Sequence, residues 1–181
     1  MKLKNFVFLI TFLLTAPMVF AQSDLENLVK EGIELHENGN YEEAIETYKK
    51  ALVIDPKSTL VNYEIALSYF TKGDYEEAVK YSDVVLKQDE DFILQAYLTK
   101  GSALDLLGRT QESIKLFEKG IKEKGGHYLL YYNLGVNYYK MNDFANTQEN
   151  VIQAIEHNPK HPSGHLLLAK IHKQKGTPVQ S

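Results

Sequence analysis

Four of the six histidines lie near the C-terminus, where they could gather imidazoles around a metal ion: His157, His161, His165 and His172. The first three are spaced four residues apart, which would place them on one side of a helix. Pro159 and Pro162 interrupt any such helix, because proline lacks the backbone N–H that a helix interior needs. We therefore predict no metal site here, and we expect His165 and His172 to pack within the fold.

No other residue pattern predicts catalysis or cofactor binding. The chain has no cysteine, which excludes disulfides, thiolate metal sites and a cysteine nucleophile. It has no phosphate-binding glycine loop, zinc-protease motif or calcium loop, and the acidic run Asp89-Glu90-Asp91 lacks calcium-ligand spacing. That run is predicted to be a solvated turn. The sequence thus predicts a non-enzymatic protein without a cofactor or a metal ion.

The charge of the chain argues against binding to nucleic acid. Its 20 basic and 24 acidic residues give a net charge of −4, and Arg109 is the single arginine in the sequence. Phosphate backbones are bound mainly through lysine and arginine on a positively charged surface. With 44% hydrophobic and 24% charged residues, the composition is that of a folded globular chain. We therefore expect no nucleic-acid partner.

The first 21 residues have the pattern of a secretory signal. Two lysines precede an uncharged apolar run from Asn5 to Phe20, and Val19 and Ala21 are small residues at the positions that a signal peptidase inspects. We expect cleavage after Ala21 and export of residues 22–181, with no integral membrane span, to the periplasm or the cell exterior. An uncleaved N-terminal anchor is the alternative, and it also exports the remainder of the chain. Without the two lysines, that remainder has a net charge of −6.

A phrase of six residues recurs with a period of 34 residues. Gly39-Asn40-Tyr41-Glu42-Glu43-Ala44 returns as Gly73-Asp74-Tyr75-Glu76-Glu77-Ala78, with weaker echoes that begin at Gly108 and Asn142. A period of this length is typical of stacked helical hairpins. The period predicts four units, with Ile93 as a one-residue insertion between the second and the third: 25–58, 59–92, 94–127 and 128–161.

Each predicted first helix carries a small residue where its second helix would approach closely: Gly32, Ala66, Gly101, Gly135 and, in a fifth helix, Ala169. A larger residue follows three positions later, and another anchor precedes the small residue by four positions. The three therefore lie on one helical face.

The second helices carry recognisable start and stop signals. Their predicted N-caps are Asn40, Asp74 and Asp143. A glutamate three residues after each of the first two completes the spacing of a capping box. Their predicted ends lie at Pro56, Pro159 and the pair Gly125-Gly126.

These features resemble the tetratricopeptide repeat family. The first unit matches the family pattern best, at Gly32, Gly39, Tyr41, Ala44, Tyr48, Ala51 and Pro56. The third unit departs most, because Thr110 replaces the aromatic residue and Gly120 replaces the second alanine. The resemblance implies an all-α fold, a right-handed α-solenoid of about four stacked helix-turn-helix hairpins. It also implies a C-terminal capping helix over 162–176, which covers the last apolar face.

Beside the packing face, each first helix carries a second apolar stripe, which the family's superhelix would turn towards its concave side. We predict a partner-binding groove lined by Val29, Ile33, Tyr63, Leu67, Phe70, Leu98, Tyr132, Val136 and Tyr139. Family members that grip a terminal carboxylate use lysines, asparagines and an arginine here, and this chain has apolar residues instead. Such a groove suits an apolar helix or an extended peptide. The alternative is that the stripe packs within the chain or between copies of it.

The function that these features predict is that of an exported, non-enzymatic adaptor that binds a protein or peptide ligand in its concave groove. Two alternatives stay open. One is a permanent accessory subunit of an envelope assembly or secretion machine, for which a large apolar patch on the convex face would be evidence. The other is a homo-oligomeric scaffold, which the size of the protein in solution would reveal.

Overall fold

The computed structural model describes residues 22–88 and 91–176, and these residues form nine helices and no strand. The first helix covers residues 22–37 of the described part. It is followed by α2 (Tyr41–Ile54), α3 (Thr59–Lys72), α4 (Tyr75–Leu86), α5 (Ile93–Leu106), α6 (Thr110–Lys124), α7 (Tyr128–Lys140), α8 (Phe144–His157) and α9 (Pro162–Gly176). The predicted signal segment and Asp89-Glu90 of the predicted acidic turn lie outside the described residues.

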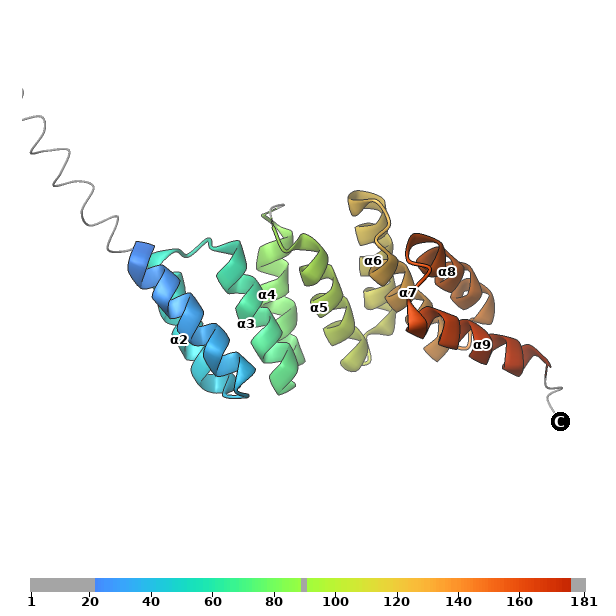
Figure 1. Ribbon diagram of the computed structural model, residues 1–181, viewed down its shortest axis with the longest axis horizontal. Coiled ribbons are helices and arrows are strands. Elements are labelled where there is room, and N and C mark those ends of the chain that lie inside the picture. The colour runs from blue at the N-terminus through green and yellow to red at the C-terminus, as the bar shows by residue number, and fades with distance from the viewer. Residues whose placement is uncertain (1–21, 89–90, 177–181) are drawn as a thin grey trace, which may run out of the picture.

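The helices stack as hairpins in a single row that runs from the N-terminal helix to α9 (Figure 1). Each helix packs on its neighbours along the chain, and the first helices of successive hairpins also meet, α3 with α5 and α5 with α7. The predicted all-α, right-handed α-solenoid is confirmed. Three apolar clusters follow one another along the row, and each joins neighbouring hairpins. Every hairpin therefore buries its apolar face against the next one.

The predicted column of small residues lies at the contact between the two helices of each hairpin. Gly32, Gly101 and Gly135 are buried, and so is Ala66. A Cβ atom added at Gly32 would lie 2.3 Å from the Tyr48 ring, and one added at Gly101 would lie 2.2 Å from the Phe117 ring. Both distances are far below van der Waals contact. A ring from the second helix therefore occupies the space that a side chain on the first helix would need.

In α9 the residue of this column is not buried. Ala169 is exposed, and so are His165 and His172, so the prediction that these two histidines pack within the fold is wrong. In the other units this face takes the second helix of the hairpin, but no second helix packs on α9 in the part of the chain that the structure describes. The helix instead buries Leu167 and Ile171, which face α8 and α7.

The helix boundaries agree with the predicted signals, and the capping bonds agree in part. Asn40, Asp74 and Asp143 each stand directly before a second helix, but only the Asp143 side chain accepts a capping bond, from the Asn146 N–H at 3.1 Å. Asp74 pairs with Lys72 at 2.8 Å instead. The capping boxes predicted at Asn40 and Asp74 therefore lack their first hydrogen bond, the one from the helix N–H to the N-cap side chain.

The one-residue insertion before the third hairpin is absorbed by a strained backbone. Phe92 has φ +65°, in the left-handed region that residues other than glycine seldom adopt. Its ring stacks on Tyr63 of α3, with ring centres 5.1 Å apart and planes 12° apart. The stacking holds the unusual backbone in place, and α5 begins at the next residue.

The first prediction tests the close contact at Gly101. Gly101→Ala should lower the free energy of unfolding by about 1–3 kcal/mol, because the added methyl group displaces the Phe117 ring. Alanine is the better helix former, so propensity alone predicts the opposite sign. The measurement is chemical denaturation, with the neighbouring Ser102→Ala as a control that should change little. Phe117→Leu makes room for the methyl group, so the double variant should lose less than the two single losses added. A Gly101→Ala protein of unchanged stability would contradict this packing.

Candidate partner-binding groove

The nine residues predicted to line the groove lie along successive first helices, and all of them are half-buried. They are Val29 and Ile33 on the N-terminal helix, Tyr63, Leu67 and Phe70 on α3, Leu98 on α5, and Tyr132, Val136 and Tyr139 on α7. Their surroundings differ strongly from one end of the array to the other. Some of these residues pack against other parts of the chain, whereas others border an open space.

At the C-terminal end, the stripe is packed against α9. Tyr132, Val136 and Tyr139 surround the cluster that contains Leu167 and Ile171 of that helix. The Tyr132 ring also meets His161 edge-on, with centres 4.7 Å apart. Intramolecular packing, the alternative considered for the stripe, therefore accounts for this end.

In the middle of the array, aromatic contacts hold the stripe. Tyr63 stacks on Phe92, as described above, and Phe70 packs on Tyr75 with ring centres 5.7 Å apart. Leu98 packs against the apolar cluster between the third and fourth hairpins. These side chains are partly accessible, but their positions are already set by neighbours.

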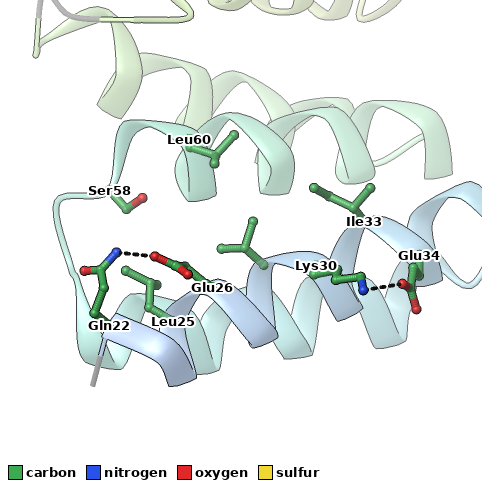
Figure 2. A pocket seen from close by; sticks show the side chains of 9 residues that line it. Gln22, Leu25, Glu26, Lys30, Ile33, Glu34, Ser58 and Leu60 are labelled. Carbon is green, nitrogen blue, oxygen red and sulfur yellow. Dashed lines mark hydrogen bonds and ion pairs between the residues drawn. The ribbon is translucent and has the colours of Figure 1, made fainter. Parts of the chain in front are cut away.

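The N-terminal end of the stripe opens into an apolar pocket between the N-terminal helix and α3. Its volume is about 490 Å³, and Leu25, Val29, Ile33 and Leu60 form its apolar lining. Figure 2 shows Ile33 and Leu60 extending into the space from the two facing helices. Two of the predicted groove residues thus line a pocket that the described chain leaves open.

Polar side chains form the rim of this pocket. They are Gln22, Glu26, Lys30, Glu34 and Ser58. The Gln22 amide donates to Glu26 at 2.9 Å, and Lys30 lies 3.9 Å from Glu34 (Figure 2). Both contacts join residues four apart on the same helix, so they leave the apolar floor uncovered.

Three residues of this end were missed by sequence reasoning: Leu25, Leu60 and Glu64. Leu60 lies three residues before Tyr63 and seven before Leu67, so extending the stripe by one helical turn would have found it. Leu25 is the corresponding extension on the N-terminal helix. Glu64 carried no signal, because a glutamate on a helix is normally a solvated residue.

Glu64 is a half-buried carboxylate on α3, four residues after Leu60. The Tyr48 hydroxyl donates to it over a long distance of 3.5 Å. Burial raises the pKa of Glu64, and the nearby Glu37 carboxylate raises that pKa further, while the Tyr48 hydrogen bond opposes the shift. Burial also raises the pKa of Tyr48 well above its usual range, and Glu64 adds to that shift.

A second cavity, of similar volume, lies between α4, α5 and α6 and is lined mainly by charged residues. Both of its carboxylates are paired: Lys100 lies 2.5 Å from Asp83, and Arg109 lies 2.6 Å from Glu112. Two further lysines, Lys115 and Lys119, also line this cavity, so its lining carries a net positive charge.

Among the described residues, no group of three histidine or carboxylate side chains is arranged to hold a metal ion. The described helices also include none with the length and hydropathy needed to cross a membrane.

The row of hairpins defines the class of the protein as a helical-hairpin repeat. Family models described as TPR repeat and tetratricopeptide repeat match residues 32–73, 63–127 and 128–161, so they follow one another over most of the chain. The chain belongs to the tetratricopeptide repeat family.

Known relatives extend the same picture. A TPR repeat-containing protein of Methanocaldococcus jannaschii is 25% identical over 157 residues, which is 81% of this chain and 27% of that protein. The chain spans between 11% and 27% of the length of five curated relatives that it matches. Such partial coverage reflects a repeat array shared with longer proteins.

Among solved structures, the pilF protein of Pseudomonas aeruginosa has a TM-score of 0.74 at 20% identity, over 86% of this chain and 70% of that one. MamA of Desulfovibrio magneticus has a TM-score of 0.71 at 21% identity, over 84% and 85%. YrrB, described as a TPR protein with an unusual peptide-binding site, has a TM-score of 0.63 at 16% identity, over 82% and 76%. At these identities the likeness concerns the fold.

The second prediction tests α9 as the cap of the array. Ile171 is fully buried and Leu166 is 59% exposed, on the same helix. Ile171→Ala should lower the free energy of unfolding by about 2–5 kcal/mol, because it leaves a cavity beside the stripe residues of α7. Leu166→Ala should change the free energy of unfolding by less than about 0.5 kcal/mol. Thermal and chemical unfolding of both variants measure the difference. Equal losses would show that α9 packs through another face.

Proposed function

We propose that this protein is an exported, non-enzymatic interaction module that binds a peptide or a partner protein in its concave groove. The observation that carries the proposal is the apolar pocket at the N-terminal end, which Val29, Ile33, Leu25 and Leu60 line and no described part of the chain fills. An open apolar surface of this kind in a folded protein marks a place where another molecule is buried.

The packing around the groove suits binding. The lining residues stand on helices that are locked into the array by the contacts at Gly32 and its equivalents. Binding to a surface that is already ordered loses little conformational entropy, so more of the burial energy contributes to affinity. A repeat array also places several such positions along one face, which suits an extended or helical peptide.

The comparisons support the proposal at the level of the family. YrrB is described as having a peptide-binding site, and its fold resembles that of this chain. A permanent accessory subunit of an envelope machine is the alternative, and it requires a broad apolar patch on the second helices. Among the described residues, the large apolar side chains exposed on second helices are Val53 and Ile54. These two adjacent residues at the end of α2 do not form a broad apolar patch on the convex face, so the groove is favoured as the binding surface.

Export is proposed from the N-terminal pattern of two lysines, an apolar run and Ala21. The third prediction concerns this step. Protein recovered from its native host should have the intact mass of a chain that begins at Gln22, and it should be found in the periplasm or outside the cell. Mass spectrometry after cell fractionation checks both. A cytoplasmic protein that retains Met1 would contradict the proposal.

The fourth prediction concerns the groove. Leu60→Ser places a hydroxyl on the pocket floor, and it should weaken capture of the partner at least tenfold while preserving helicity. Leu106→Ser makes the same chemical change at a residue that is 53% exposed and lies on α5, away from the pocket. Quantitative affinity capture from the exported fraction, with both variants and the unchanged protein side by side, measures the difference. If the two variants capture the same proteins equally well, the pocket does not bind the partner.

A further inference from the structure

We propose that the N-terminal pocket selects a peptide in which a lysine or arginine stands next to apolar side chains, and that Glu64 and Glu37 receive the cation. This inference rests on the proposed function, because it names the chemistry of the ligand that the groove would bind.

The apolar floor and the two carboxylates belong to the same pair of helices. Leu60 and Glu64 are four residues apart on α3, and Ile33 and Glu37 are four residues apart on the N-terminal helix. Residues with this spacing are neighbours on one helical face, about 5–6 Å apart. In Figure 2 both helices run from the Gln22 and Ser58 end towards Ile33. By their spacing, Glu37 and Glu64 lie just beyond the pocket lining, one turn after Ile33 and Leu60. A peptide that lies in the pocket therefore meets an apolar surface first and two carboxylates one turn later.

The Glu64 carboxylate lacks a cation of its own among the described residues. Its hydrogen-bond partner is the hydroxyl of Tyr48, and the charged group that raises its pKa is another carboxylate, Glu37. A partly buried carboxylate beside a like charge is unfavourable, and its raised pKa reflects that cost. Tyr48 itself is fully buried and fixed against Gly32, so the carboxylate is held at the helix interface.

The rim adds to the negative charge. Glu26 and Glu34 line the pocket together with one basic residue, Lys30, which lies 3.9 Å from Glu34. Glu37 and Glu64 lie one helical turn beyond Ile33 and Leu60 and add two more carboxylates at this end of the molecule. An acidic peptide would be repelled here, and a purely apolar one would bury Glu64 further without pairing it.

The charged cavity between α4, α5 and α6 shows the contrast. There, Asp83 and Glu112 each have a basic partner in the chain. Glu64, in contrast, has no basic partner among the described residues, and it lies one helical turn from Leu60 of the open apolar pocket. A lysine or arginine side chain fits this arrangement, because its aliphatic stem can lie on the apolar floor while its charged end reaches the carboxylates.

The test uses a random dodecapeptide display library selected on the purified protein. Recovered peptides should be enriched in lysine or arginine beside apolar residues. Synthetic copies of these peptides, measured by fluorescence anisotropy, should bind the Glu64→Gln variant about tenfold more weakly than the unchanged protein. Their binding to the unchanged protein should also weaken as the salt concentration is raised. Glu31→Gln, on an exposed position of the N-terminal helix, is the matched control and should bind normally.

Stability provides a second measurement that separates a binding role from a structural one. Glu64→Gln removes an unpaired charge, so its melting temperature should stay the same or rise. The folded protein holds the Glu64 proton more tightly than the unfolded chain does, so Glu64 destabilises the fold progressively as pH rises from the ordinary glutamate pKa through the raised one. Peptide binding should change in the opposite sense, weakening as pH falls through the raised pKa. The titratable groups that face Glu64 are Tyr48 on α2, Glu37 on the N-terminal helix and Tyr63 on α3 itself.

The possible outcomes are distinguishable. Peptides that bind without a basic residue, are unaffected by Glu64→Gln and are lost with Leu60→Ser would overturn the selectivity and leave the groove in place. A selection that yields no peptide sensitive to Leu60→Ser would overturn the groove and the selectivity together. A Glu64→Gln protein that loses both binding and stability would assign Glu64 to the fold.

Discussion

The structure depends on the close approach of the two helices within each hairpin. Tyr48 lies against Gly32, and Phe117 lies against Gly101, at distances that leave no room for a Cβ atom. A ring fills the space above each of these two glycines, and Val151 lies against Gly135, so each of these hairpins has one well-packed arrangement. The next hairpin then packs on a surface of defined shape. The curvature of the row, and the face on which any ligand would bind, follow from the repetition of this contact.

Stacking uses the first helices twice, once for the hairpin and once for the neighbouring unit. The stripe beside the hairpin contact is therefore unavailable to a ligand wherever a neighbouring part of the chain packs against it. Tyrosines fill it on α7, and α9 covers them. On the N-terminal helix the stripe residues are Val29 and Ile33, and no described helix covers them, so together with Leu25 and Leu60 they leave a pocket. The presence or absence of a covering helix thus separates a self-packed end from an open end.

Electrostatics divides the molecule in a similar way. Carboxylates such as Asp83 and Glu112 are paired with basic residues of the chain, and such contacts need no further partner. Glu64 instead shares its surroundings with Tyr48 and Glu37. An unpaired carboxylate at an inter-helix position lowers the stability of the free protein, a cost that a function at that position would explain. The apolar pocket and the unpaired charge occur together, and this coincidence gives the N-terminal end its chemical character.

The architecture could be predicted from the sequence because helical periodicity and the 34-residue repeat are local properties. Gly32, Gly101 and Gly135 lie where their spacing predicted, and the turns at Pro56 and Gly125 end helices as expected. Local pattern decides which residues share a helical face, but it does not decide what covers that face. His165 and His172 lie on the same helical face as Ala169 and are exposed, since no described second helix packs on α9. Likewise, the openness of the pocket and the burial of Glu64 depend on two helices brought together by the stack, so only the tertiary structure decided them.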